Sequence, residues 1–357
     1  TVNTGSTAND ITVSTTVTWD GTKIYDDVII NSGGSITHSA NTTTNQYNLN
    51  LIALGNLSIN GTGKIDATGK GFAAGSGPGA GNGASYGGGS LAYGSISSPD
   101  DLGSGGNAGN APGSGGGLIR LNISGTLTNN GAINVNGNLG GGGICTYWDE
   151  WGYCSSFVPA GAGGSGGTVY VSVGTFAGSG SITVNGGNTG ASDGYGQTNG
   201  GSGGRIAVYS TARTYSGTIT ANGGIGNGGA GTVYQKQGAY AANRDEQSGD
   251  LTLDNNSVSG AATPAMTTAL TLANLTIQKN ANLSIPSGRT VTSTNLTIQW
   301  IGVASVASGG ALTTTNFTLA TAGTFTTVGS MTTSNLTVNG AFNLNTNLSV
   351  NPTRNLA

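Results

Sequence analysis

The sequence predicts an all-β protein, a parallel β-solenoid in which coils of about twenty residues stack on one another. Three observations support this prediction. An Asn-Leu-Thr-Ile unit or a close variant starts at residues 274, 295, 316 and 335, with separations of 21, 21 and 19. Apolar and polar residues alternate within each unit, as in a strand with one buried face. The chain also has 68 glycines and only 7% charged residues, whereas ordinary domains have about 7% glycine and about 25% charge.

Residues 1–24 are expected to form an N-terminal strand or cap segment. The stretch ITVSTTVTWDG alternates well and ends in an Asp-Gly turn, which is a strand signal. The opening TVNTGSTAND has no initiator Met and no charged-then-apolar leader pattern. We therefore expect a mature or trimmed product, and export is inferred rather than read from a leader.

Residues 25–242 are predicted to form a β-helix with glycine-rich loop insertions. Segments 115–138, 166–188 and 203–224 share a Gly-Gly start, two alternating strands and an Asn-Gly stop. The glycine-rich segments between them shorten along the chain, and insertions of this kind emerge on one side of a solenoid. Two interpretations of them remain open. They supply turns and coat the surface, or residues 71–90 form packed extended segments that contact a neighbouring subunit.

Residues 243–357 are predicted to continue the β-helix with the Asn-Leu-Thr repeats. Leu275 and Ile277 should point inward, and the matching residues of the next coils should stack over them as one apolar column. The charge-rich window 243–254 is the best candidate boundary between the two kinds of repeat.

The decapeptide CTYWDEWGYC at 145–154 contains both cysteines and two of the four tryptophans. With no third Cys and no His nearby, a Cys145–Cys154 disulfide in an oxidising compartment fits better than a metal site. Three roles remain open for its aromatic side chains: covering the solenoid's own flank or sealing one of its ends, contacting another subunit, or stacking on sugar rings. The predicted contact loop comprises Tyr147, Trp148, Trp151 and Tyr153.

The sequence contains no arrangement that we interpret as catalytic, metal-binding or cofactor-binding. Its 14 acidic residues are dispersed, and the only histidine, His38, has no sequence partner that would make it a base or ligand. Arg120, Arg205 and Arg213 are interpreted as a solvated polar row on an outer sheet face. No basic stripe predicts nucleic-acid binding, and no apolar run is long enough to predict a membrane span.

The repeats also match the N-glycosylation pattern Asn-x-Ser/Thr. Because an Asn-Leu-Thr unit at every strand generates such matches automatically, we interpret most of them as structural, although some could be modified. The candidate acceptors in the repeats are Asn274, Asn295, Asn316 and Asn335. Further matches occur at Asn41, Asn56, Asn60, Asn122, Asn255, Asn282 and Asn347.

The stretches GGSGGRIAVY, GTITANGG and NLSINGTGKIDATGKG resemble the glycine-rich parallel β-helix proteins of bacterial and archaeal cell surfaces, a group that includes adhesin and autotransporter-passenger-like stalks. The resemblance covers roughly residues 25–240 and is weaker beyond. It implies a right-handed helix, in agreement with the preferred hand of parallel crossovers.

From this resemblance we expect an extracellular structural protein of the cell surface, a self-associating filament or adhesive stalk subunit and not an enzyme. Its expected partners are further copies of itself and a surface glycan. One alternative is a polysaccharide lyase, hydrolase or carbohydrate-binding β-helix, because this fold also hosts such proteins. A further alternative is an ice-binding surface, suggested by threonine-rich runs such as TTTNFTLATAGTFTT.

Overall fold

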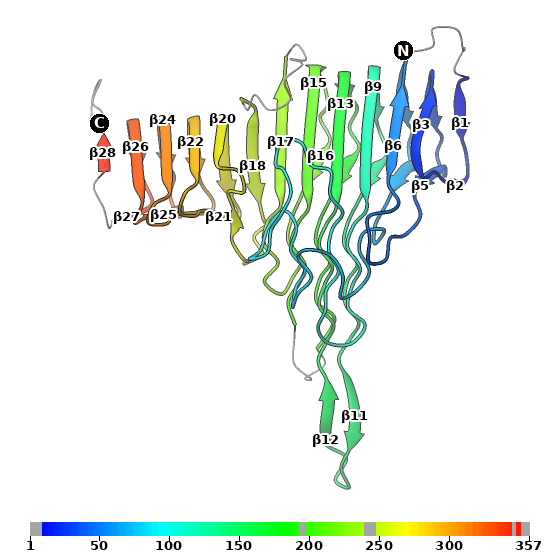
Figure 1. Ribbon diagram of the computed structural model, residues 1–357, viewed down its shortest axis with the longest axis horizontal. Coiled ribbons are helices and arrows are strands. Elements are labelled where there is room, and N and C mark those ends of the chain that lie inside the picture. The colour runs from blue at the N-terminus through cyan, green and yellow to red at the C-terminus, as the bar shows by residue number, and fades with distance from the viewer. Residues whose placement is uncertain (1–8, 193–197, 239–247, 345–347, 351–357) are drawn as a thin grey trace.

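Strands alone make up the regular structure of the described chain, which confirms the all-β class (Figure 1). The computed structural model describes residues 9–192, 198–238, 248–344 and 348–350. Three predictions fall partly outside the described residues: the cap at residues 1–8, the boundary at 242–243, and the final strand and tail with Asn347 and residues 351–357.

One long sheet runs the length of the described chain. Among the described residues it has 15 strands, and β3 (Gly21–Tyr25) and β6 (Leu49–Ala53) lie off its main path, with β6 pairing with β9. Its main path is β1 (Ile11–Val13), β4 (Val28–Ile30), β7 (Leu57–Ile59), β9 (Leu118–Asn129), β13 (Thr168–Ala177), β15 (Arg205–Arg213), β17 (Thr232–Gln237), β18 (Asp250–Asp254), β20 (Ala269–Gln278), β22 (Thr290–Ile298), β24 (Ala311–Leu319), β26 (Ser330–Val338) and β28 (Leu348–Val350).

Two shorter sheets accompany the long sheet, and the chain alternates between them and it. The N-terminal sheet is β16 (Thr218–Thr220), β14 (Ser181–Thr183), β10 (Ala132–Asn134), β8 (Lys64–Asp66), β5 (Ser35–Thr37) and β2 (Thr16–Thr18). The C-terminal sheet is β19 (Thr263–Pro264), β21 (Asn282–Ile285), β23 (Val303–Val306), β25 (Thr324–Thr327) and β27 (Ala341–Leu344). A separate hairpin consists of β11 (Ile144–Trp148) and β12 (Cys154–Val158).

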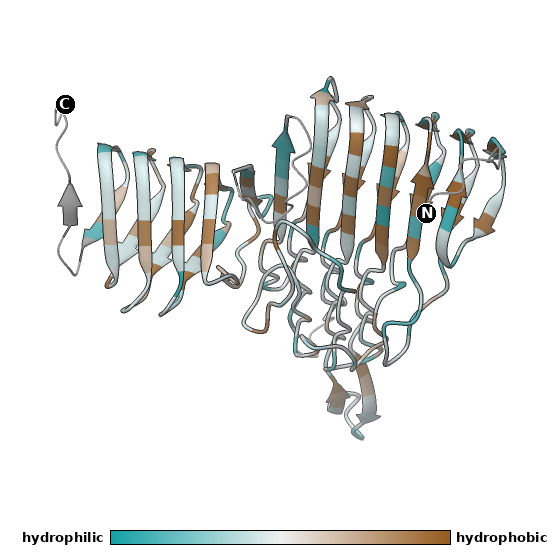
Figure 2. Ribbon diagram, turned by 45° about the horizontal axis from the view of Figure 1, so that its top comes forward, coloured by the Kyte–Doolittle hydropathy of each residue, from teal (hydrophilic) through white to brown (hydrophobic). Residues whose placement is uncertain are grey.

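The predicted in-register stacking of the repeats is confirmed. Asn274 pairs with Asn295, and the same register continues through Asn316 to Asn335. The leucine that follows Asn274 stacks under the equivalent residues of the next two coils, and all three are 1% exposed. Figure 2 shows the resulting hydrophobic bands across neighbouring strands. These columns bury the apolar face that no single coil could bury alone.

The repeats predict that all neighbouring strands pair parallel, and this prediction is wrong for one pair of strands. Strands β17 and β18 pair antiparallel, with Tyr234 opposite Leu251, whereas every other pair within the three sheets is parallel among the described strands. The chain therefore reverses direction within the long sheet. The two strand sequences alternate equally well in either direction, so the hydrophobic pattern contains no signal for this reversal.

The apolar core changes faces at the same place. Val169, Ile206 and Val233 pack in a first core beneath the N-terminal sheet. Their neighbours Tyr170 and Tyr234 point to the opposite face and join a second core, which continues beneath the C-terminal sheet. Because successive strand residues alternate between faces, β13, β15 and β17 are buried on both sides.

The glycine-rich insertions form an ordered bundle of extended segments along one side of the sheets (Figure 1). Every backbone N–H from 161 to 167 donates to a carbonyl of another segment, at 2.7–3.0 Å. The acceptors lie in 135–141, then 104–108, then 199–202, and this order repeats every three residues. A period of three is that of an extended helix with three residues per turn. Glycine leaves room for the neighbouring backbones at 161, 163, 164, 166 and 167.

The interpretation of the glycine-rich segments as turns and surface coating is therefore incomplete. Residues 160–170 are all buried, yet 160–167 contain no strand. Within 71–90, Tyr86 is fully buried and the Gly87 N–H donates to the Gly203 carbonyl at 3.0 Å. Extended segments do pack together, as one interpretation held, and these contacts lie within a single chain.

Candidate functional site

The disulfide-bonded hairpin projects from the end of the glycine bundle farthest from the sheets (Figure 1). The bundle holds its base: the Gly143 N–H donates to the Ala191 carbonyl at 2.8 Å, and the Asn110 N–H donates to the Pro159 carbonyl at 2.8 Å. Because each of these partners belongs to a different insertion, the base is fixed from more than one side.

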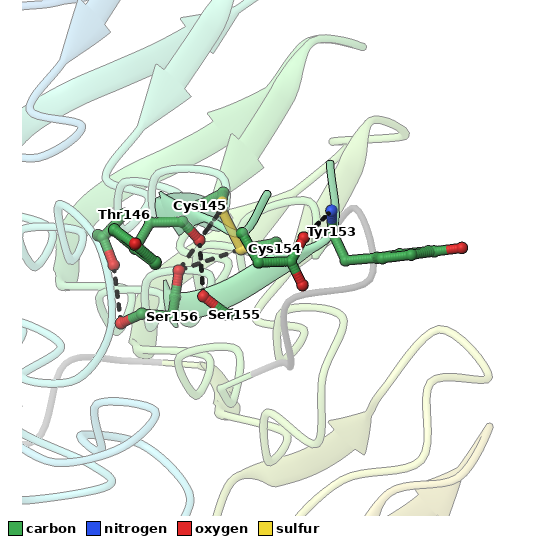
Figure 3. Close-up of a disulfide and its surroundings, with 8 residues drawn as sticks. Cys145, Thr146, Tyr153, Cys154, Ser155 and Ser156 are labelled. Carbon is green, nitrogen blue, oxygen red and sulfur yellow. Dashed lines mark hydrogen bonds between the residues drawn. A yellow bond between two sulfur atoms is a disulfide. The ribbon is translucent and has the colours of Figure 1, made fainter. Parts of the chain in front are cut away.

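The predicted Cys145–Cys154 disulfide is confirmed. It joins β11 to β12, with the two Cα atoms 5.8 Å apart (Figure 3). Beside it the Thr146 hydroxyl donates to Ser156 Oγ at 3.0 Å. A disulfide between adjacent strands limits the conformations of a two-stranded hairpin, which is at best marginally stable alone. Such a bond also fits an oxidising compartment.

Asp149 organises the tip of the hairpin. Its carboxylate oxygen Oδ1 accepts the backbone N–H of Trp151 at 2.9 Å and that of Tyr153 at 2.8 Å. Gly152 supplies the left-handed residue of this turn, with φ of +76°. An Asp side chain that binds the backbone two residues on is a standard turn-former. The backbone around the aromatic residues is thus fixed by local bonds and by the disulfide.

The aromatic side chains of the hairpin face solvent. The exposed fractions are 65% for Tyr147, 57% for Trp148, 77% for Trp151 and 72% for Tyr153. In Figure 3 the ring of Tyr153 extends away from the chain. The interpretation that these rings cover the protein's own flank is therefore wrong. The two interpretations that need an external partner, another subunit or a sugar, both remain predictions.

Arg205 departs most from its sequence interpretation. It was expected in a solvated row, but it is fully buried on β15. Its guanidinium donates to the Tyr93 carbonyl at 2.8 and 3.0 Å and to Thr232 Oγ1 at 3.2 Å. Burial lowers the pKa of Arg205 from its usual value, whereas the nearby Tyr86 and Asp101 raise it. The arginine ties the first glycine-rich insertion to the face of the long sheet that belongs to the second core.

His38 also has a structural role that the sequence does not reveal. It is fully buried, its Nδ1 lies 2.8 Å from the Ser39 carbonyl, and its Nε2 lies 3.1 Å from the Leu118 N–H. A neutral imidazole with the proton on Nδ1 satisfies both contacts, because Nε2 then accepts the N–H that opens β9. Gly117 makes room for this contact, because a Cβ there would overlap the imidazole.

We expect the free energy of unfolding to fall as the pH drops below 6.5, the ordinary His value, because burial lowers the pKa of His38. In that range the unfolded chain binds a proton that the folded chain does not, so stability decreases by up to about 1.4 kcal/mol per pH unit. Asp20 and Asp66, whose hydrogen bonds lower their pKa below 3.8 despite burial, titrate at more acidic pH. In urea titrations between pH 7 and 5, the free energy of unfolding should fall with pH in the wild type and should not fall in the His38→Gln variant. An unchanged slope would contradict this role.

The candidate glycosylation acceptors form a side-chain ladder. The Asn295 amide donates to Asn274 at 2.8 Å, Asn316 donates to Asn295 at 2.8 Å, and Asn335 donates to Asn316 at 2.7 Å. The ladder ends on Asp250, which accepts from Asn274 at 2.6 Å. Each nitrogen that glycosylation would modify is thus occupied by a hydrogen bond, which supports the structural interpretation of the repeated Asn.

No group of three or more His, Cys, Asp or Glu side chains that could hold a metal ion occurs in the described ranges. The described part of the chain also contains no helix with the length and apolar character needed to cross a membrane.

The site and fold define an all-β protein of stacked, mostly parallel strands that carries an exposed, disulfide-bonded aromatic hairpin. Comparison with protein-family models and with curated proteins finds no match. Among solved structures the chain is similar to the Tapirin C-terminal domain of Caldicellulosiruptor kristjanssonii, with 11% sequence identity and a TM-score of 0.24. The match covers 98% of this chain and 56% of that one, so this chain spans little more than half its length. A likeness at this level supports no argument about function.

Proposed function

We propose that this protein is an extracellular surface protein, a right-handed β-helix stalk whose disulfide-bonded hairpin is its adhesive contact. The observation that carries the proposal is the exposure of four aromatic side chains on a cross-linked hairpin at the tip of an ordered bundle. Trp and Tyr dominate the binding energy of protein contacts. A rigid hairpin also loses little conformational freedom on binding, which raises affinity.

The two changes at the β17–β18 junction are consistent with a coil that keeps one hand in both halves. Strand direction reverses there, and the covering sheet moves to the other face of the long sheet. Either change alone would invert the hand of a coil that advances along one axis, whereas both together preserve it. Parallel crossovers are right-handed in about 98% of cases, so a coil that keeps one hand throughout fits the expected hand in both halves.

We propose that the partner of the hairpin is another copy of this chain. The strands at the two ends of the long sheet also leave open edges, since β1 pairs only with β4 and β28 only with β26 among the described strands. Unpaired strand edges are templates for pairing with another chain. Contacts at the hairpin and at the ends would together build a filament or an adhesive array.

The test is a variant in which Tyr147, Trp148, Trp151 and Tyr153 are all replaced by alanine. We expect the wild type to associate as its concentration rises in analytical ultracentrifugation, and the variant to associate only at much higher concentration, through the open strand edges alone. The reason is that removing several hot-spot aromatics costs about 2 kcal/mol or more each. The matched control is Leu91→Ala, which removes another side chain that is 52% exposed. A wild type that stays monomeric at every concentration refutes self-association. Hairpin-dependent retention on polysaccharide particles would instead assign the hairpin to glycan.

A further inference from the structure

A polar cleft of about 170 Å³ lies where the first core ends. Strand β16 is the last strand of the N-terminal sheet, while the long sheet continues beneath it through β17, β18 and β20. Residues 219–222 line one wall, and Gln235, Thr252 and Asp254 line the floor. A single water needs only about 10–15 Å³, so the cleft has room for a larger ligand.

Two hydrogen-bond acceptors in the cleft have no donor. Asn136 Oδ1 accepts the Asn185 N–H at 2.7 Å, and Asn185 Oδ1 accepts the Asn222 N–H at 2.8 Å. Asn222 ends this ladder in the cleft, and no described residue donates to its side-chain oxygen. The Gln235 Oε1 atom is buried and also lacks a partner. Buried acceptors are satisfied in nearly all proteins, so the unpartnered Gln235 Oε1 marks the floor of the cleft as polar. Asn222 is only partly buried, and its side-chain oxygen is open to a hydroxyl group of a ligand.

Asp254 holds a fixed cluster of polar groups at the other side of the cleft. Its Oδ2 accepts from Lys279 Nζ at 2.9 Å and from Gln278 Nε2 at 2.9 Å, and its Oδ1 accepts the Asn256 N–H at 2.7 Å. Gln278 is held in turn by Gln299, whose amide donates to Gln278 Oε1 at 2.9 Å. These side chains are oriented before any ligand arrives.

Trp300 lies beside this cluster and is 59% exposed, with its ring centroid 5.9 Å from Lys279 Nζ. It occupies a tight turn with Ile301, and their φ values are +47° and +63°. The turn one coil earlier is formed by Lys279 and Asn280, with φ of +49° and +64°. Asn accepts this left-handed conformation readily, but a β-branched residue rarely does. An exposed Trp-Ile pair at such a turn has no evident packing role.

We propose that this cleft and Trp300 beside it bind a neutral polysaccharide chain, independently of the hairpin. The C–H face of one sugar unit stacks on Trp300, which lies outside the cleft lining, and the neighbouring unit enters the cleft. There a sugar hydroxyl donates to Asn222, and Lys279 donates to a hydroxyl oxygen. Among the described residues that line the cleft, the one carboxylate is that of Asp254. Hydrolysis of a glycosidic bond normally requires two, so the proposal is for binding alone.

Affinity electrophoresis in native gels tests the proposal, with β-glucan, xylan and galactomannan as the soluble probes. At least one of them should retard the wild type. Trp300→Ala should raise the apparent dissociation constant about tenfold, the loss of one aromatic stacking contact. Asn222→Ala should weaken binding severalfold. Both variants should melt within a few degrees of the wild type, because Trp300 is exposed and Asn222 ends its ladder.

The matched control is Trp151→Ala on the hairpin, which should leave the retardation unchanged. Absence of retardation in all three gels overturns the proposal, as does a Trp300→Ala variant that binds like the wild type. The proposal is also overturned if the Trp151→Ala variant is no longer retarded while the Trp300→Ala variant still is. That result would mean that the polysaccharide binds to the hairpin. Loss of self-association with intact sugar binding, or the reverse, separates this site from the proposed hairpin contact.

Discussion

Gly187→Ala is expected to destabilise the protein by about 3 kcal/mol or more, because overpacking against backbone cannot be relieved by a rotamer change. Gly187 lies inside the glycine bundle, where its N–H donates to the Gly164 carbonyl at 2.8 Å. A Cβ at this position would overlap the carbonyl group of Asn138. Accommodating it requires the two extended segments to separate. Urea unfolding followed by circular dichroism measures the loss.

Gly142→Ala is the matched control for this substitution. Gly142 belongs to the same glycine-rich region, but its added Cβ would meet only the Ala191 carbonyl oxygen at 3.5 Å, an ordinary contact. Its change in stability should stay within about 0.5 kcal/mol, as for most surface substitutions. Equal stability of the two variants would mean that the segments are not closely packed.

Arg205→Ala should also cause a large loss, about 3–5 kcal/mol. The substitution leaves a cavity in a fully buried site and removes the donor for the Tyr93 carbonyl and Thr232 Oγ1. It also loosens the inserted segment around Tyr93, where the guanidinium is the tie to the long sheet, while Tyr209 OH still donates to the Ser97 carbonyl at 2.7 Å and Thr168 Oγ1 to the Asp101 carbonyl at 2.6 Å. Limited proteolysis followed by mass spectrometry should therefore show new cleavage within residues 84–102.

Arg120→Ala is the control for Arg205→Ala, because Arg120 is only partly buried on β9 and stacks over Tyr170 with its guanidinium carbon 4.5 Å from the ring centroid. Its replacement should cost about 1 kcal/mol or less. If Arg205→Ala costs no more than Arg120→Ala and residues 84–102 remain resistant to protease, the segment is held by other contacts.

The hydrophobic pattern predicted the part of the fold that depends on periodicity. Stacking of Leu275 under Leu296 follows from period-two alternation and a fixed repeat length, both of which are visible in the sequence. The reversal at Leu251 is not visible there, because alternation has no direction. The charge of Arg205 suggested that its side chain is exposed to solvent. In the structure a carbonyl group of a segment about a hundred residues earlier takes the place of water as its hydrogen-bond partner, and the sequence does not show the path of that segment.

The hairpin was predictable in its chemistry and only partly in its geometry. Two cysteines around an aromatic decapeptide indicated a disulfide, and the structure confirms it. Sequence alone left open whether the rings turned inward, because exposure depends on the glycine bundle beneath them. The junction cleft was not predicted at all. Its lining residues Asn222, Asp254 and Lys279 come from different repeats, and only the change of covered face brings them together at one open cleft.

Native-state hydrogen exchange of the amides of Gly161, Gly163, Gly164, Gly166 and Gly167 tests the central claim most directly, namely that glycine-rich segments without strands form an ordered hydrogen-bonded bundle that holds the hairpin in place. These amides should exchange as slowly as those of Val169 and Val171 in the adjacent core strand, because every one of them donates to a carbonyl of another segment. Exchange at the rate of an unstructured peptide would contradict it.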